Sequence, residues 1–150
     1  MIEVMPRPTN IYHSHHATYV LKYHIVWITK YRRRKFIEEK RSKCKEVLRS
    51  LCTEYEWIPE TMEVSSDHVH LYLVTDPADR PCDVVAILKS KSASILKQEF
   101  PELQAGKGRV WARGYFISSV NDRTTSKIIN QYINKHNLEE ERLARQLRLL

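Results

Sequence analysis

No stretch of the sequence is hydrophobic over the roughly 18 consecutive residues that a membrane-spanning helix needs. The first residues also lack the basic start and the apolar segment of a secretory signal peptide. Cysteine is scarce: the three cysteines form no Cys-x-x-Cys pair, and their odd number argues against a disulfide framework. These absences predict a soluble, cytoplasmic protein with no membrane partner. Its 150 residues suffice for one domain with a core of its own.

Acidic residues are fewer than basic ones, 18 against 25, so the formal net charge is +7. Such an excess favours a polyanionic partner, with nucleic acid ahead of a membrane surface. One group of basic residues surrounds a tyrosine directly after an expected strand, a pattern that suits phosphate contacts and base stacking. Others lie on an expected helix and in a glycine-containing loop. The predicted nucleic-acid-binding residues are Lys30, Tyr31, Arg32, Arg33, Arg34, Lys35, Lys89, Lys91, Lys107 and Arg109.

Residues 67–73 (DHVHLYL) alternate between polar and apolar side chains, which predicts a β-strand with one covered face. Val69, Leu71 and Leu73 would point into the core. His68 and His70 would project side by side from the other face, at a spacing that allows both rings to bind one metal ion. The alternative is a pair of surface histidines on an ordinary amphipathic strand, because so short a motif often has no function.

The elements around this strand predict an α+β fold. Strands are expected at 18–29, 57–66 and 110–120, and helices at 36–55 and 82–100. Together with the histidine strand they give the order βαββαβ, which is the ferredoxin-like arrangement of a four-stranded antiparallel sheet with two helices on one face. The first and third strands are central in this fold. His24 is therefore expected on the same open face as His68 and His70.

A further helix is expected from residue 123 to about 136, with an apolar stripe that would cover the open face of the sheet. Tyr132 and His136 are four residues apart and so lie on the same side of this helix. A tyrosine in such a stripe more often contributes to packing than to chemistry. Residues 1–17 are predicted to be a flexible N-terminal arm, and residues 138–150 a C-terminal helical tail.

The segment DHVHL at 67–71, followed much later by YINKH at 132–136, resembles the small single-tyrosine HUH transposases of the IS200/605 type. The name HUH describes two histidines that flank a hydrophobic residue. Residues 23–32, 62–64 and 100–103, and Trp111 with residues 115–116, are also similar to that family. The resemblance covers most of the chain and implies a transposase catalytic domain at 18–137.

The resemblance also implies roles for individual residues. His68 and His70 would hold Mg²⁺ or Mn²⁺ against a phosphodiester of single-stranded DNA. Tyr132 would attack the phosphorus, giving a 5′-phosphotyrosine and a free 3′-hydroxyl. The substrate would be single-stranded DNA with hairpins at the ends of an insertion sequence, which the enzyme would cleave and rejoin. Similar proteins are homodimers in which the tyrosine helix of one chain completes the histidine site of the other.

One position departs from the family pattern. Similar proteins usually carry Gln or Asn four residues after the tyrosine, where this chain has His136. Imidazole can bind a metal, so we predict His136 as a third ligand beside His68 and His70. The alternative is an exposed histidine near a helix C-terminus, where a positive charge is favourable. Because imidazole generally suits Zn²⁺ better than Mg²⁺, the choice of metal follows from the resemblance alone.

Three other functions are compatible with a basic protein of this topology. A non-catalytic RNA-binding module of the same topology would show a Lys/Arg-Gly-aromatic signature, whereas the third strand carries His-Val-His. A two-histidine phosphoesterase would need a His-x-Thr/Ser motif on a neighbouring strand, and the expected strands at 18–29 and 57–66 contain none. A host-adopted relative remains the open alternative. Such a protein would bind hairpin DNA, or act as a nuclease associated with repetitive elements, without moving an insertion sequence.

Overall fold

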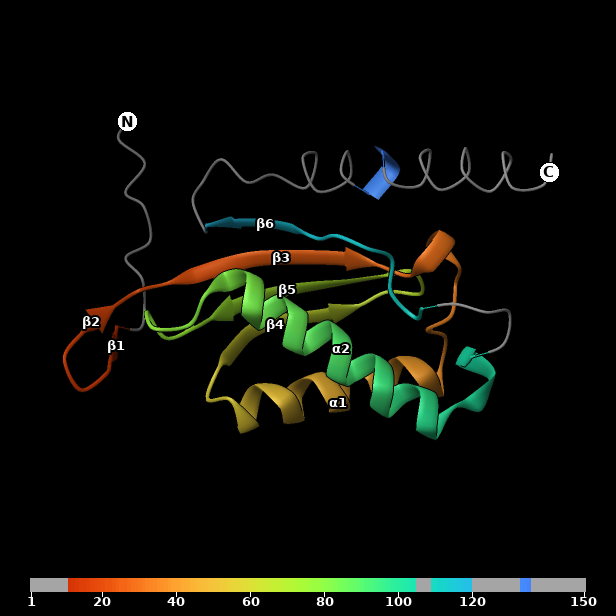
Figure 1. Cartoon of the computed structure of the whole chain (residues 1–150), viewed down its shortest axis with the longest axis horizontal. Helices are drawn as coiled ribbons and strands as arrows, with labels where there is room; N and C mark the ends of the chain where they lie inside the picture. The colour runs from red at the N-terminus through yellow and green to blue at the C-terminus, as the bar shows by residue number, and fades with distance from the viewer. Residues whose placement is uncertain (1–10, 105–108, 120–132, 136–150) are drawn as a thin grey trace, which may run out of the picture.

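Four antiparallel strands form one sheet, and two helices pack on one of its faces in the computed structural model (Figure 1). The structure describes residues 11–104, 109–119 and 133–135. The strands lie in the order β4-β5-β3-β6, so the first and third long strands are central, as predicted for a ferredoxin-like fold. The elements are β1 (Tyr12–His13), β2 (Thr18–Tyr19), β3 (Lys22–Ile28), η1 (Lys30–Arg32), α1 (Glu39–Glu54), β4 (Ile58–Val64), β5 (His68–Val74), α2 (Pro81–Glu99), η2 (Pro101–Gln104) and β6 (Phe116–Ser119).

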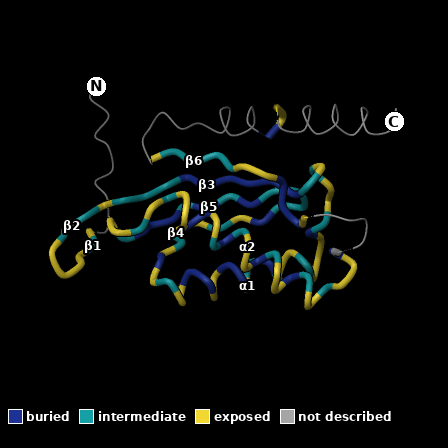
Figure 2. Tube along the Cα trace, in the orientation of Figure 1, coloured by how far each residue is buried: buried dark blue, intermediate teal, exposed yellow. Residues whose placement is uncertain are grey.

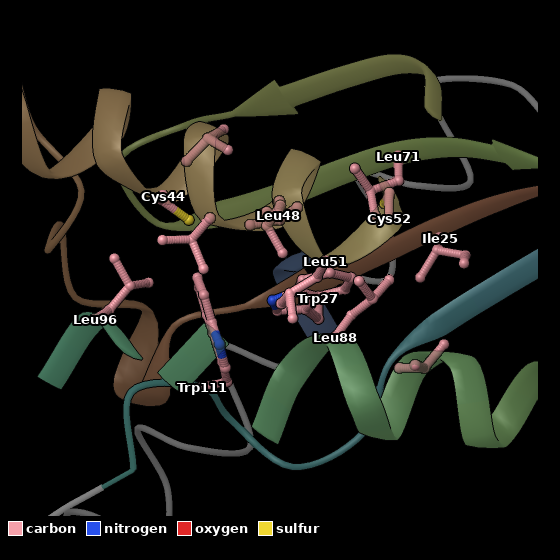
Figure 3. Close-up of a cluster of buried hydrophobic side chains, with 14 of the residues drawn as sticks. Ile25, Trp27, Cys44, Leu48, Leu51, Cys52, Leu71, Leu88, Leu96 and Trp111 are labelled. Carbon is pink, nitrogen blue, oxygen red and sulfur yellow. The ribbon is translucent and has the colours of Figure 1, made fainter. Parts of the chain in front are cut away.

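The main core lies between the sheet and the two helices (Figures 2 and 3). Alternate residues of β3 and β5 point into it, because successive side chains of a strand face opposite sides of the sheet. The helices contribute apolar residues at three- and four-residue spacing. Its most deeply buried members include Ile25, Trp27, Leu71, Leu73, Leu48, Leu88 and Leu96. Cys44 and Cys52 are part of this core, and burial raises the pKa of their thiols to about 12 and about 11.

The strand predicted at 18–29 is divided in two. Thr18 and Tyr19 form β2, which pairs with β1 in a separate two-stranded ribbon, and β3 begins only at Lys22. Tyr19 stacks on Tyr12, with ring centroids 6.0 Å apart, and is not part of the main core. Residues 11–17 of the predicted arm thus include a strand and a turn, whereas residues 1–10 lie outside the described residues.

The fourth strand is much shorter than the predicted segment 110–120, because β6 begins at Phe116. Val110, Trp111 and Ala112 are buried, but only an isolated bridge joins Trp111 to Thr29. The indole Nε1 of Trp111 instead donates to Ser92 Oγ at 3.0 Å, which gives the buried hydroxyl of Ser92 on α2 a partner. Ile95, on the same helix, is 40% exposed despite its apolar side chain.

The face of the sheet opposite α1 and α2, called the open face below, carries a second and smaller apolar cluster. Val26 and Ile28 of β3 meet Ala112 and Ile133 there, with Phe116 packed against them. Residues 133–135 are helical and Ile133 is buried, as expected for a helix that covers this face. The rest of that predicted helix, with Tyr132 and His136, and the tail at 138–150 lie outside the described residues. No helix in the described ranges is long and apolar enough to span a membrane.

Candidate functional site

His68 opens strand β5 and lies at the end of the open face, next to a carboxylate. Its Nδ1 is 2.8 Å from Oδ1 of Asp67. The other oxygen of Asp67, Oδ2, accepts a hydrogen bond from Nε of Arg32 at 2.9 Å. Burial alone would raise the pKa of Asp67, but the hydrogen bonds from His68 and Arg32 hold it below its ordinary value. The ionised carboxylate therefore accepts the Nδ1 hydrogen of His68 and leaves Nε2 of that ring available as a ligand.

This arrangement is typical of a metal-binding histidine, in which a carboxylate orients the ring and makes its free nitrogen more basic. The sequence predicted Asp67 only as the first residue of the strand segment 67–73 and gave it no part in the site. Its position immediately before the first histidine was the available sequence signal. The contact with Arg32, 35 residues earlier in the chain, had no signal in the sequence.

His70, one pleat further along β5, faces a third histidine. The register places Val26 opposite His70 and His24 opposite Tyr72, so His24 is diagonal to His70 on the open face. Nδ1 of His24 lies 3.1 Å from Nε2 of His70, and the ring of His24 lies 3.6 Å from that of Tyr72. Burial, followed by the proximity of His70, lowers the pKa of His24 to about 4. Burial also lowers the pKa of His70, so both rings are neutral at pH 7.

These histidines form an incomplete ligand set for a divalent metal. Neutral imidazole is the form that binds metals, and the Asp67 carboxylate orients one of the two predicted ligands. Within residues 11–104, 109–119 and 133–135, however, no three His, Cys, Asp or Glu side chains are grouped so that they could hold a metal together. The residues present therefore fit a metal that takes its remaining ligands from elsewhere. His136, the predicted third ligand, lies outside the described residues.

The helical segment 133–135 is joined to this site through Arg32. Nη1 of Arg32 donates to Oδ1 of Asn134 at 3.3 Å, while Nε of the same guanidinium binds Asp67. Ile133 is anchored in the small cluster on the open face. One arginine thus connects a segment near the C-terminus to the carboxylate that orients His68. Asn134 was not predicted as a site residue, because the contact spans 102 residues of sequence.

The basic loop at 30–35 begins directly after β3 and borders the histidine site. The backbone N–H of Thr29 donates to the carbonyl of Asp67 at 2.9 Å, which holds the start of the loop beside His68. Tyr31 and Arg32 have positive φ angles, 57° and 50°, an uncommon conformation for residues other than glycine. Tyr31 is 38% exposed, with the charged groups of Lys30 and Arg33 5.4 Å and 5.5 Å from its ring centroid.

The other predicted nucleic-acid-binding residues lie elsewhere. Lys89 and Lys91 belong to α2, in the helical layer on the opposite side of the sheet. The amine of Lys89 donates to the carbonyls of Ala112 and Gly114, at 2.7 Å each, and that of Lys91 donates to the hydroxyl of Tyr55. Arg109 is exposed and lines, with Lys89, a cavity of about 780 Å³. Lys107 falls outside the described residues.

The neutral state of His24 gives a testable pH dependence of stability. Its pKa is about 4 in the folded protein and about 6.5 in an unfolded chain, so only the unfolded state takes up a proton between these values. We expect the free energy of unfolding to fall as the pH drops from 6.5 towards 4, by on the order of 2 kcal/mol from this residue. Urea unfolding at pH 7 and pH 4.5, with a chelator present, measures the change. The His24→Asn variant should show a smaller decrease, and an identical decrease would contradict the assignment.

Comparison with known proteins places this chain in a family. The model of the family described as "Transposase IS200 like" matches residues 17–136. The transposase of insertion sequence IS200 from Salmonella typhimurium is 36% identical over 87 residues, which are 57% of this chain and 55% of that protein. The ISDra2 transposase TnpA of Deinococcus radiodurans is 35% identical over 81 residues, 53% of this chain and 58% of that protein. The chain thus spans little more than half the length of these curated relatives.

Two solved structures are similar to most of the chain. One is a crystal structure of a protein from Deinococcus radiodurans R1 described as a transposase, with a TM-score of 0.78 and 32% identity, covering 83% of this chain and 96% of that one. The other is a REP-associated tyrosine transposase bound to a REP hairpin, with a TM-score of 0.51 and 13% identity, covering 83% and 74%. The second shows the fold alone. The family match and the first structure extend over most of the described residues, and the chain belongs to the IS200-like transposase family.

Proposed function

We propose that this protein cleaves and rejoins single-stranded DNA at the hairpin-bearing ends of an insertion sequence, through a 5′-phosphotyrosine intermediate and with Mg²⁺ or Mn²⁺. The observation that carries the proposal is the pair His68 and His70 on the open face, with Asp67 bound to the first ring and linked through Arg32 to Asn134. Membership of the IS200-like family supports a DNA-transferring enzyme. The protein would act in the cytoplasm, where chromosomal DNA is accessible.

His68 and His70 would hold the metal with His136. A divalent ion bound there would polarise a phosphoryl oxygen and stabilise the charge that develops during cleavage. Asp67 keeps the hydrogen of His68 on Nδ1, so Nε2 can serve as a ligand. If His136 is the third ligand, His136→Gln should bind Mn²⁺ better than His136→Ala, because an amide oxygen can replace the ring and a methyl group cannot. Equal binding by the two variants, measured by calorimetry, would remove His136 from the site.

Tyr132 would be the nucleophile. Its phenolic oxygen forms a bond to phosphorus as the bond from phosphorus to the 3′-oxygen breaks, and the tyrosine proton is released while the 3′-oxygen gains one. The phosphate ester on tyrosine conserves the energy of the original bond, so a 3′-hydroxyl of another strand can reverse the reaction. Ile133 and Asn134, the next two residues, are held against β3 and Arg32, which supports a helix lying over the histidine site.

The basic loop would bind the DNA strand beside the histidines. Lys30, Arg33 and Arg34 could contact phosphates, and the exposed ring of Tyr31 could stack on a base. The guanidinium of Arg32 binds Asp67 and Asn134. We therefore propose that Arg32 holds the site together and also contributes positive charge to the loop. The REP-associated relative binds a hairpin according to its description, and we propose a hairpin ligand here too. A host-adopted hairpin-binding protein remains the alternative, and subterminal hairpins in the DNA flanking the gene would favour transposition over it.

We also propose that the protein acts as a homodimer with shared active sites. In the single chain, Ile133 and Asn134 contact the sheet and loop of their own chain. Two chains could exchange this segment and make the same contacts with each other, because a domain swap preserves the contacts of the exchanged element.

The polarity of the covalent product gives a direct test. A single-stranded hairpin DNA is labelled at its 3′ end in one reaction and at its 5′ end in another. With Mn²⁺, the 3′ label should appear in a protein-bound band that withstands denaturant, and the 5′ label in a shorter free strand ending in a 3′-hydroxyl. A chelator should abolish both products, and a perfect duplex of the same sequence should yield neither. Cleavage that leaves no label on the protein would indicate a hydrolytic nuclease and contradict the proposal.

A further inference from the structure

His24 is the most deeply buried histidine of the open face, and neither the sequence nor family membership gives it a role. It is 4% exposed. Its Nδ1 lies 3.1 Å from Nε2 of His70, and its ring is held against Tyr72. Its own Nε2 is buried and finds no hydrogen-bond partner among the described residues. A buried polar atom without a partner costs about 1–3 kcal/mol. The next two residues on its face of β3, Val26 and Ile28, are apolar, so a buried histidine here needs an explanation.

The contact between His24 and His70 can exist in only two forms when both rings are neutral. Each ring carries one N–H and one lone pair, and the hydrogen bond uses the N–H of one and the lone pair of the other. If His24 donates from Nδ1, it occupies the lone pair of His70 Nε2. The remaining nitrogen of His70, Nδ1, then carries the hydrogen. In that form neither nitrogen of His70 is available to a metal.

The reverse form leaves a ligand free. If His70 donates its hydrogen from Nε2 to Nδ1 of His24, then Nδ1 of His70 carries a lone pair. A histidine that binds a metal through one nitrogen and donates from the other to a fixed acceptor is the usual arrangement in metalloproteins. Asp67 fulfils this function for His68, with the charged carboxylate at 2.8 Å. His24 can fulfil it for His70 without adding a charge to the buried side of the site.

We propose that His24 is a positioning residue of the metal site: it accepts a hydrogen bond from Nε2 of His70, fixes that ring, and thereby makes Nδ1 of His70 the metal-binding nitrogen. The two histidines of the motif would then use different nitrogens, Nε2 in His68 and Nδ1 in His70, because their orienting partners approach different sides of the rings. The inference rests on the proposed function for the presence of a metal, but the preference for one hydrogen position on His70 holds without it.

Two substitutions separate positioning from simple packing. His24→Asn keeps a hydrogen-bonding atom close to the place of Nδ1, whereas His24→Leu fills similar space with no polar atom. We expect His24→Leu to weaken Mn²⁺ binding by about 10- to 100-fold in calorimetry without DNA, and His24→Asn to remain within a few-fold of the unmodified protein. Circular dichroism and melting temperature confirm that both variants are folded. Unchanged binding in the leucine variant, or equal losses in the two variants, would overturn the inference.

Ring nitrogen spectra of ¹⁵N-histidine-labelled protein provide the second measurement. In the metal-free protein near pH 7, His70 should carry its hydrogen on Nε2, and this preference should disappear in His24→Leu. On addition of Zn²⁺ as a diamagnetic probe, the Nδ1 signal of His70 and the Nε2 signal of His68 should shift. A hydrogen on Nδ1 of His70, or Zn²⁺ bound at its Nε2, would overturn the inference. Because the metal-free spectrum involves no DNA, this result is independent of whether the protein cleaves DNA.

Discussion

Replacing Tyr132 with Phe is expected to abolish the covalent protein–DNA adduct and to leave hairpin binding intact. The change removes one oxygen, so the aromatic ring can pack as before, but no atom is left to form the ester with phosphorus. The loss should be at least about 1,000-fold, since removal of an enzyme's nucleophile has effects of that order or larger. The measurement is the denaturant-resistant band formed by 3′-labelled hairpin DNA with Mn²⁺, together with DNA affinity from a gel-shift titration.

Tyr72 provides a matched control for this variant. It lies on β5 two residues after His70, on the same face of the sheet, and packs against His24. Burial raises the pKa of its phenol, so Tyr72 ionises less readily than an ordinary tyrosine. Tyr72→Phe should therefore retain the adduct. If the adduct survived in Tyr132→Phe and vanished in Tyr72→Phe, the nucleophile would be Tyr72.

The parts of the fold that depend on repeating patterns could be predicted from the sequence. Alternation over 67–73 placed Val69 and Leu71 in the core and His68 and His70 on the open face, because a strand has only two faces. The order of strands and helices then gave the sheet topology. The divided first strand and the short fourth strand were mispredicted, because β-rich composition extends through residues that pair with other partners. Thr18 pairs with His13, and Trp111 pairs with Thr29. No local pattern in the sequence predicts either contact.

The candidate site shows the same division. The positions of the two histidines on the open face could be predicted from their spacing, and the basic loop from its charge; their roles stay predictions. His24 was predicted to share their face, but the contacts themselves were not predicted, because they join distant parts of the chain: Arg32 reaches Asp67 and Asn134, and His24 meets His70 46 residues away. A sequence shows which residues can make such contacts but not which ones meet. The register of β3 on β5 decides the second case, since a slip by one residue would turn His24 to the other face.

Mixing two inactive variants should restore DNA cleavage if the active sites are shared between chains. One variant carries His68→Ala and His70→Ala and lacks the metal ligands; the other carries Tyr132→Phe and lacks the nucleophile. Each should be inactive alone, with activity lower by at least about 1,000-fold. In a mixed dimer with exchanged tyrosine helices, one site combines both defects and the other contains none. After random exchange of subunits at equal concentration, about a quarter of all sites should be intact.

The contacts of residues 133–135 make this outcome informative. Ile133 is buried against Val26 and Ile28, and Asn134 accepts a hydrogen bond from Arg32. The segment that follows Tyr132 therefore has a defined binding position on the open face of a sheet. If this segment always binds the sheet of its own chain, each active site contains the tyrosine and the histidines of one chain, and the mixture stays inactive. If the segment binds the sheet of the partner chain, activity returns. This restored activity should fall again when Arg32→Ala is added to the tyrosine-mutated chain. That chain supplies the intact histidines in the working site, so its Arg32 must hold both Asp67 and the incoming Asn134. The same substitution in the histidine-mutated chain should have a much smaller effect, because its Arg32 serves only the site that is already inactive.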